Sequence, residues 1–188
     1  MFAFTSFSFD YGEAESGYRF CINGIQTHLT TNNPDLYRAQ EFLLMLLMSY
    51  AYFHYERGLV NKALEYFHQA HEVCVRTRGE NYPLIVLVLN NLGLVYRRKG
   101  DNENALRYFQ EAEKLGTNFP DSNDMAYVHL NLGYLHLEKD MLMEARRHCK
   151  QAFKQSKRTG DEEGKRGSKE CLAEVRKALF ARIYSKVS

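Results

Sequence analysis

Residues 92–112 read LGLVYRRKGDNENALRYFQEA, and this stretch contains the pattern that decides the fold. Its key positions, in order, are Leu92-Gly93-x2-Tyr96 and Gly100-x4-Ala105-x3-Phe109-x2-Ala112. On both sides of Gly100, small and aromatic residues recur three or four positions apart, which is the spacing of one helix face. A glycine between two such faces ends the first helix. The stretch therefore predicts two helices joined by a short turn, with Gly93 allowing the second helix to approach closely.

The same pattern occurs twice more in the chain. The further copies are Gly58-x4-Ala63-x3-Phe67-x2-Ala70 upstream and Asp140-x4-Ala145-x3-Cys149-x2-Ala152 downstream. The period of 42 and then 40 residues exceeds the ~34 residues of a common tetratricopeptide repeat, yet each unit is still one helical hairpin. We therefore predict an all-α fold, in which tetratricopeptide-type helical hairpin repeats stack as a short right-handed superhelix with a C-terminal capping helix.

Turn and cap residues between the repeats set the expected helix limits. The expected helices are 36–57, 59–77, 83–99, 101–116, 123–139, 141–158 and 162–184. The expected segments are 1–35, an incomplete N-terminal repeat and linker; 36–160, three repeats; and 161–188, a basic C-terminal capping helix. The phenylalanine-rich residues 2–9 form helices poorly, so we expect an irregular N-terminus. The incomplete repeat leaves apolar surface uncovered, which favours a homodimer through this end.

Composition agrees with one soluble helical domain, since 45% of the residues are hydrophobic and 26% charged. Residues 1–145 carry 12 Lys+Arg against 18 Asp+Glu, whereas residues 146–188 carry 13 against 5. We expect this basic end to be a solvated cap, with no nucleic acid bound.

The longest apolar run, Phe42–Phe53, has 12 residues and is too short to cross a ~30 Å hydrocarbon layer. It is interpreted as a buried helix, and no transmembrane segment or N-terminal targeting signal is expected.

Motifs that announce catalysis are missing: the sequence has no P-loop, GxGxxG, GxSxG or HExxH pattern. One set of possible metal ligands is spaced by three along one helix: His68, His71 and Cys74. Steps of three turn these side chains progressively around the helix, and the set lacks a fourth ligand. His148 is interpreted as a surface residue beside a packing cysteine. The four cysteines are Cys21, Cys74, Cys149 and Cys171. They form no CxxC pair and indicate no disulfide framework, which favours a thiol-reducing compartment. We expect no enzyme activity, no metal and no cofactor.

The positions that matter for binding lie on the first helix of each repeat. One residue before the Leu-Gly pair, two repeats carry Asn91 and Asn131, 40 residues apart. An asparagine amide both donates and accepts, so a short asparagine ladder can contact the backbone of an extended peptide. The alternative is that these amides only tie neighbouring helices together. The predicted peptide-binding groove consists of Asn91, Asn131, Tyr52, Leu94, Arg98 and Tyr134.

Three further stretches carry a resemblance to a known family. They are Gly17-Tyr18-x-Phe20-Cys21-Ile22, Gln69-Ala70 with Gly79-Glu80-x-x-Pro83, and Gln151-Ala152-x-Lys154-Gln155-x-Lys157 leading to Leu172-Ala173-Glu174. In order and spacing, these stretches resemble the C-terminal part of the mitochondrial tetratricopeptide repeat protein 19 family. The competing resemblance is to kinesin-light-chain-type repeats, which share a period near 42 and the Leu89-Asn90-Asn91-Leu92 sequence.

The two resemblances imply different partners. The mitochondrial family implies a scaffold associated with the inner membrane that supports respiratory complex III and helps clear fragments of its Rieske iron-sulfur protein. Complex III subunits are then the expected protein partners. The kinesin-light-chain resemblance implies instead a cytoplasmic cargo adaptor. The mitochondrial family brings no catalytic residues.

Overall fold

The computed structural model describes residues 11–28, 36–78, 83–120 and 122–184. These ranges hold eight α-helices and no strand. The helices are α1 (Tyr11–His28), α2 (Leu36–Glu56), α3 (Val60–Arg78), α4 (Leu84–Arg98), α5 (Asn102–Gly116), α6 (Asp124–Glu138), α7 (Leu142–Thr159) and α8 (Glu162–Tyr184). The seven helices predicted from residue 36 onward are confirmed, each to within one residue at either end. The phenylalanine-rich residues 2–9, and residues 79–82 between the expected helices 59–77 and 83–99, lie outside the described ranges.

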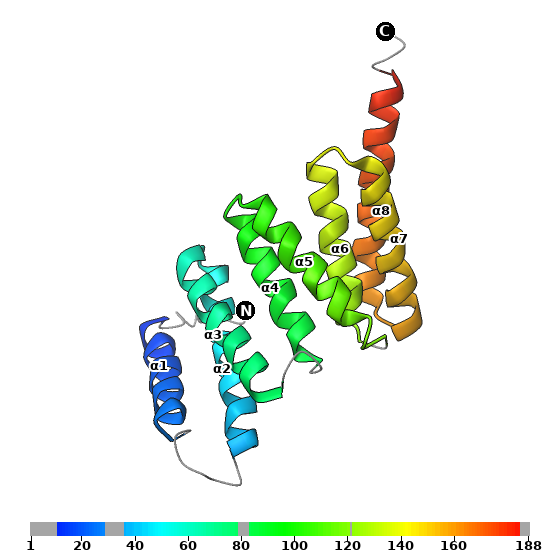
Figure 1. Cartoon of the computed structure of the whole chain (residues 1–188). Helices are drawn as coiled ribbons and strands as arrows, with labels where there is room; N and C mark the ends of the chain where they lie inside the picture. The colour runs from blue at the N-terminus through cyan, green and yellow to red at the C-terminus, as the bar shows by residue number, and fades with distance from the viewer. Residues whose placement is uncertain (1–10, 29–35, 79–82, 121, 185–188) are drawn as a thin grey trace, which may run out of the picture.

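Consecutive helices pair into antiparallel hairpins that stack side by side from α1 at one end to α8 at the other (Figure 1). The hairpins are α2–α3, α4–α5 and α6–α7, and α3 and α5 join each hairpin to the next. Helix α8 packs on both α6 and α7. It occupies the position that the first helix of a following repeat would take. The predicted all-α repeat superhelix with a C-terminal capping helix is therefore confirmed. No described helix is long and apolar enough to span a membrane.

The turn inside each hairpin uses a backbone conformation that ordinary residues avoid. Gly58, Gly100 and Asp140 have φ angles of +73°, +84° and +57°. The repeat pattern predicts equivalent positions for these three residues, and their shared backbone conformation confirms the repeat register. Glycine adopts this left-handed region without steric strain, whereas a residue with a Cβ is strained there. The third turn therefore carries a strain that the first two lack.

Replacing the strained residue tests this difference. We expect Asp140→Gly to raise the free energy of unfolding by about 0.5–1 kcal/mol, because it removes the Cβ from a left-handed position. The reciprocal change Gly100→Asp should lower it by a similar amount. Thermal unfolding followed by circular dichroism measures both. A lower midpoint for Asp140→Gly would contradict the interpretation.

Within the second and third hairpins, the two helices meet at a glycine of the first helix. A Cβ built on Gly93 would lie 2.5 Å from the ring of Phe109, and one on Gly133 would lie 2.7 Å from the sulfur of Cys149. Phe109 and Cys149 are both fully buried. The glycine thus receives the side chain of the facing helix, and Cys149 takes in the third repeat the place that Phe109 has in the second.

Filling this space should separate the helices. We expect Gly93→Ala to destabilise the chain by about 1–3 kcal/mol, because the ring of Phe109 is enclosed and overpacking a filled core is unfavourable. Gly17 is the matched control, since it is also helical but has nothing within 4 Å of an added Cβ. Gly17→Ala should be neutral or slightly stabilising. Urea unfolding of both variants measures the contrast, and equal effects would argue against the close contact.

Two sequence interpretations around Cys149 are wrong. Cys149 and Cys171 form a disulfide between α7 and α8, with their Cα atoms 5.9 Å apart, whereas no disulfide was predicted. The residues are 22 positions apart, and only the antiparallel packing of the two helices makes them neighbours. His148, interpreted as a surface residue, is buried. The reason is that α7 is packed against both α6 and α8.

Helix α1 packs mainly on α2. The ring of Tyr18 stacks on Tyr50 with 5.0 Å between centroids and lies 6.1 Å from the ring of Phe53. A salt bridge of 3.3 Å joins Glu15 on α1 to Lys62 on α3. Within the segment predicted to be an incomplete N-terminal repeat, residues 11–28 therefore form a helix that lies against the first hairpin.

Candidate protein-binding groove

The first helices of the three hairpins, α2, α4 and α6, present side chains that line two neighbouring hollows. We define the first hollow by Tyr18, Met48, Ser49, Tyr52, Phe53 and Asn91, with a volume of about 480 Å³. The second hollow is lined by Tyr55, Leu94, Arg97, Arg98 and Glu138, with a volume of about 400 Å³. The two follow one another along α2 and α4, and together they form what we call the first-helix groove. Four of the six predicted groove residues line it: Tyr52, Asn91, Leu94 and Arg98.

The first hollow is mainly aromatic. Its wall from α1 is Tyr18, which is held against the buried Tyr50. Tyr52 is 51% exposed. Partial burial, and then the neighbouring Glu56 carboxylate, raise the pKa of the Tyr52 hydroxyl. Tyr52 therefore stays protonated at neutral pH and offers a ring together with a hydrogen-bond donor.

The second hollow is charged, and its charges are largely paired within the chain. Arg97 on α4 donates to the Glu138 carboxylate on α6, with 3.0 Å between Nε and Oε1. Arg98 turns the other way and donates to the backbone oxygen of Tyr55 on α2, with its guanidinium 4.5 Å from the centre of the Tyr55 ring. The two arginines thus connect α4 to both neighbouring first helices. The sequence analysis named Arg98 but missed Arg97, which precedes it directly.

The structure separates the two asparagines of the predicted ladder. Asn131 donates from its side-chain amide to the side-chain oxygen of Asn90, at 2.8 Å. Asn90 is buried, whereas Asn91 lines the first hollow. Asn131 therefore ties α6 to α4, which is the alternative considered for it, and it does not line either hollow.

A pair of substitutions distinguishes these two roles. We expect Asn90→Ala to lower the free energy of unfolding by about 1–3 kcal/mol, because Asn131 loses the acceptor of its amide in a partly buried place. Asn91→Ala should change it by less than about 0.5 kcal/mol, since that side chain faces a hollow. Chemical denaturation measures both. Equal losses would show that Asn91 is also part of the helix packing.

Tyr134 lies beside the groove, between α4 and the cap. The guanidinium of Arg97 is 5.7 Å from the centre of its ring, and Tyr134 also packs against the buried cluster formed by residues of α7 and α8. Burial, and then the carboxylates Glu174 and Glu170 of α8, raise the pKa of the Tyr134 hydroxyl. Tyr134 therefore ends the groove, where α8 begins to cover α6.

An exposed apolar stripe on α2 was missed by the sequence analysis. Phe42 and Met45 are 55% and 62% exposed, and Tyr52 continues the same face. The opposite face of α2, which includes Leu43, Leu47 and others, is buried. The interpretation of this run as a buried helix is therefore right for one face only. The spacing 42, 45, 49, 52 was the available signal, but apolar residues on both faces hid it.

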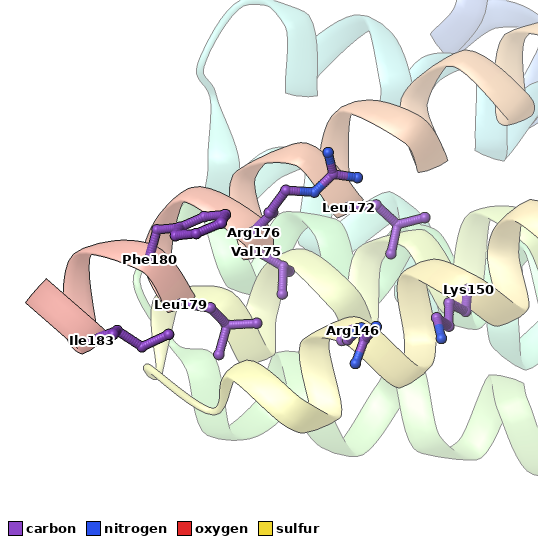
Figure 2. A pocket seen from close by; sticks show the side chains of 8 residues that line it. All are labelled: Arg146, Lys150, Leu172, Val175, Arg176, Leu179, Phe180 and Ile183. Atoms are coloured by element: carbon purple, nitrogen blue, oxygen red, sulfur yellow. The ribbon is translucent and has the colours of Figure 1, made fainter.

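The cap carries a third hollow, at the C-terminal end of the array. It has a volume of about 350 Å³ between α7 and α8. Figure 2 shows Leu179, Phe180 and Ile183 on the last turns of α8, with Arg146 and Lys150 on the neighbouring helix. Phe180 and Ile183 are more than half exposed. This hollow therefore combines apolar side chains at the end of the capping helix with basic side chains of α7.

Comparison with known proteins agrees with this architecture. Residues 42–117, which span most of the first two hairpins, match the tetratricopeptide repeat family. The fold is a tetratricopeptide repeat array. The third hairpin, whose repeat pattern is weaker, lies beyond the match. None of the curated proteins matches the chain in sequence.

Solved structures show the same fold at low sequence identity. BtubC (BKLC) from P. vanneervenii superimposes with a TM-score of 0.69 at 19% identity, covering 92% of this chain and 74% of that one. A putative kinesin light chain with nearly identical tetratricopeptide-like repeats, from Podospora anserina, has a TM-score of 0.61 at 15% identity, covering 93% and 83%. The tetratricopeptide domain of Sgt2 from Aspergillus fumigatus has a TM-score of 0.54 at 18% identity, covering 72% and 81%. Repeats of this kind are protein-interaction scaffolds, and no catalytic family is among these matches.

Proposed function

We propose that this chain is a non-catalytic scaffold whose first-helix groove holds a segment of a partner protein. The observation that carries the proposal is the continuity between the aromatic first hollow and the exposed stripe of Phe42, Met45 and Tyr52 on α2. Large apolar side chains gathered at a surface hollow mark an interaction site. Tyrosine and methionine are also among the residues enriched in protein interfaces.

The two hollows fit different parts of such a segment. The first hollow, with rings from α1 and α2, takes large apolar side chains, and the amide of Asn91 can bond to the backbone beside them. The second hollow offers the pair of Arg97 and Glu138 at its edge. A bound segment therefore places its apolar residues over α2 and its polar residues toward α6.

Truncating the apolar stripe tests the groove. We expect Met45→Ala/Tyr52→Ala to weaken partner binding by ~10-fold or more, because each buried anchor contributes on the order of 1–2 kcal/mol. Met143→Ala is the matched control, since Met143 is 63% exposed against 62% for Met45 but lies on α7, a second helix. Recovery of the partner by affinity purification, quantified by mass spectrometry, measures the difference. Equal recovery with both variants would place the binding site elsewhere.

For the partner itself, we propose subunits of mitochondrial respiratory complex III, including the Rieske iron-sulfur protein, and an inner-membrane-associated location. This proposal rests on the resemblance carried by Gly17–Ile22, Gly79–Pro83 and Gln151–Lys157. Purification of the tagged chain from isolated mitochondria should recover complex III subunits. Loss of this recovery in Met45→Ala/Tyr52→Ala, but not in Met143→Ala, would support both the partner and the groove. If neither the unaltered chain nor any variant recovers complex III subunits, complex III is excluded as the partner.

A cytoplasmic cargo adaptor of the kinesin-light-chain kind is the second candidate. It is supported by the Leu89–Leu92 sequence and by the likeness to the Podospora anserina protein, which is described as a putative kinesin light chain. Purification of the same variants from cytosol separates the candidates. Recovery of a kinesin motor or its cargo, again dependent on Tyr52, would favour the adaptor.

A further inference from the structure

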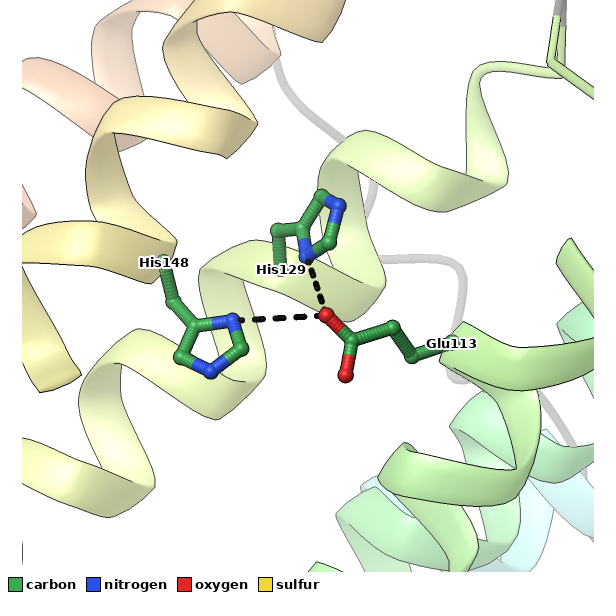
Figure 3. A group of neighbouring side chains, drawn as sticks. All are labelled: Glu113, His129 and His148. Atoms are coloured by element: carbon green, nitrogen blue, oxygen red, sulfur yellow. Dashed lines mark ion pairs between the residues drawn. The ribbon is translucent and has the colours of Figure 1, made fainter. Parts of the chain in front are cut away.

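Three side chains from three successive helices meet at the junction of the second and third repeats. Glu113 comes from α5, His129 from α6 and His148 from α7. Figure 3 shows the Glu113 carboxylate between the two imidazole rings, with Oε1 directed at both Nδ1 atoms. Oε1 lies 3.5 Å from His129 Nδ1 and 3.8 Å from His148 Nδ1. The three candidate ligand atoms all lie within 4.8 Å of one another.

The protein alone does not satisfy these atoms. Both Nδ1 atoms are buried and make no hydrogen bond, since 3.5 and 3.8 Å are too long for one. The His148 side chain is only 3% exposed. Buried polar atoms without partners are unfavourable and are rare in folded proteins. A ligand placed between the three groups would satisfy all of them at once.

The spacing fits a small metal ion. In a tetrahedral zinc site, metal–ligand bonds of about 2.0–2.2 Å place neighbouring ligand atoms ~3.3–3.5 Å apart. The Glu113–His129 separation of 3.5 Å already has this value, and the Glu113–His148 separation of 3.8 Å is close to it. Two imidazoles with one carboxylate suit zinc, whereas calcium and magnesium prefer sites made of oxygen alone. The ligand atoms of the two histidines lie within 4.8 Å of each other, so zinc binding would require their side chains to move closer together.

We propose that Glu113, His129 and His148 form a zinc-binding site that joins the second repeat to the third. The fourth position would be taken by water. His129 lines a hollow of about 380 Å³ that also contains Gln151 and Lys154. Three protein ligands and one solvent position are a common arrangement for zinc.

Arg147 controls this site. Its Nη2 atom lies 2.7 Å from Nε2 of His148, and the residue is exposed. A guanidinium only donates, so it pairs with the tautomer of His148 that has its proton on Nδ1. Zinc at Nδ1 requires the other tautomer, with the proton on Nε2. Arg147 must therefore turn into solvent when zinc binds, and its charge also opposes the cation.

Zinc binding would connect α5 to α6 and α7 by coordinate bonds. Because the site is assembled only in the folded chain, binding stabilises the fold. The thermal midpoint should therefore rise with zinc concentration. This stabilisation by zinc needs no partner protein, so its measurement does not depend on whether the first-helix groove binds one.

The test is a titration of the purified, tag-free full chain with Zn²⁺ by calorimetry, and with Co²⁺ by visible absorption. We expect one ion per chain. Glu113→Gln and His148→Gln should each weaken binding by more than ~100-fold, since even a residue that only supports a ligand is worth ~10–100-fold. His71→Gln and Cys21→Ser are controls that remove a histidine or an exposed thiol outside the cluster, and they should bind as the unaltered chain does.

Arg147→Gln gives a second test that does not depend on removing a buried residue. It removes the competing charge, and its amide oxygen can accept from Nε2 of His148. We expect affinity to rise, within the ~10-fold to 100-fold range of supporting residues. Absence of a bound ion, or binding that persists in Glu113→Gln and His148→Gln, would overturn the proposal. Unchanged affinity in Arg147→Gln would overturn the role of Arg147.

Discussion

The close approach of α4 and α5 at Gly93 is the constraint on which the rest of the array depends. The ring of Phe109 occupies the space where a side chain on residue 93 would be, so the separation of the two helices is set by one filled contact. Helix α5 then packs on α6, and α6 meets α7 at Gly133 in the same way. Because each hairpin rests only on its neighbours, this local spacing determines where the first helices lie.

Polar contacts then align the first helices and leave one apolar face uncovered. The Asn131–Asn90 hydrogen bond and the Arg97–Glu138 ion pair join α6 to α4. On α2, in contrast, Met45 faces solvent. The side of the groove toward α6 is thus occupied by contacts within the chain, while the side toward α2 keeps its apolar surface exposed. This division explains why the best candidate anchors lie in the first repeat.

The sequence predicted those features that depend on local chemistry. Helix limits and turns followed from glycine and Asx residues, and the left-handed Asp140 matches its alignment with Gly58 and Gly100. The sequence did not predict which asparagine ties the helices together. Adjacent residues such as Asn90 and Asn91 point about 100° apart on a helix, and the repeat period does not determine how the helix is rotated about its axis. Cys149 and Cys171, like Glu113 and His148, become neighbours only through packing, and no spacing rule connects them.

The packing of α1 has a consequence for the groove. Local opening begins where an element has few contacts, and α1 packs mainly on a single described helix, α2. Helix α1 is held mainly by α2, through the stacking of Tyr18 on Tyr50. Tyr18 is also a wall of the first hollow. The shape of that hollow is therefore coupled to a fraying equilibrium, and an occupant that contacts Tyr18 would slow amide hydrogen exchange throughout α1.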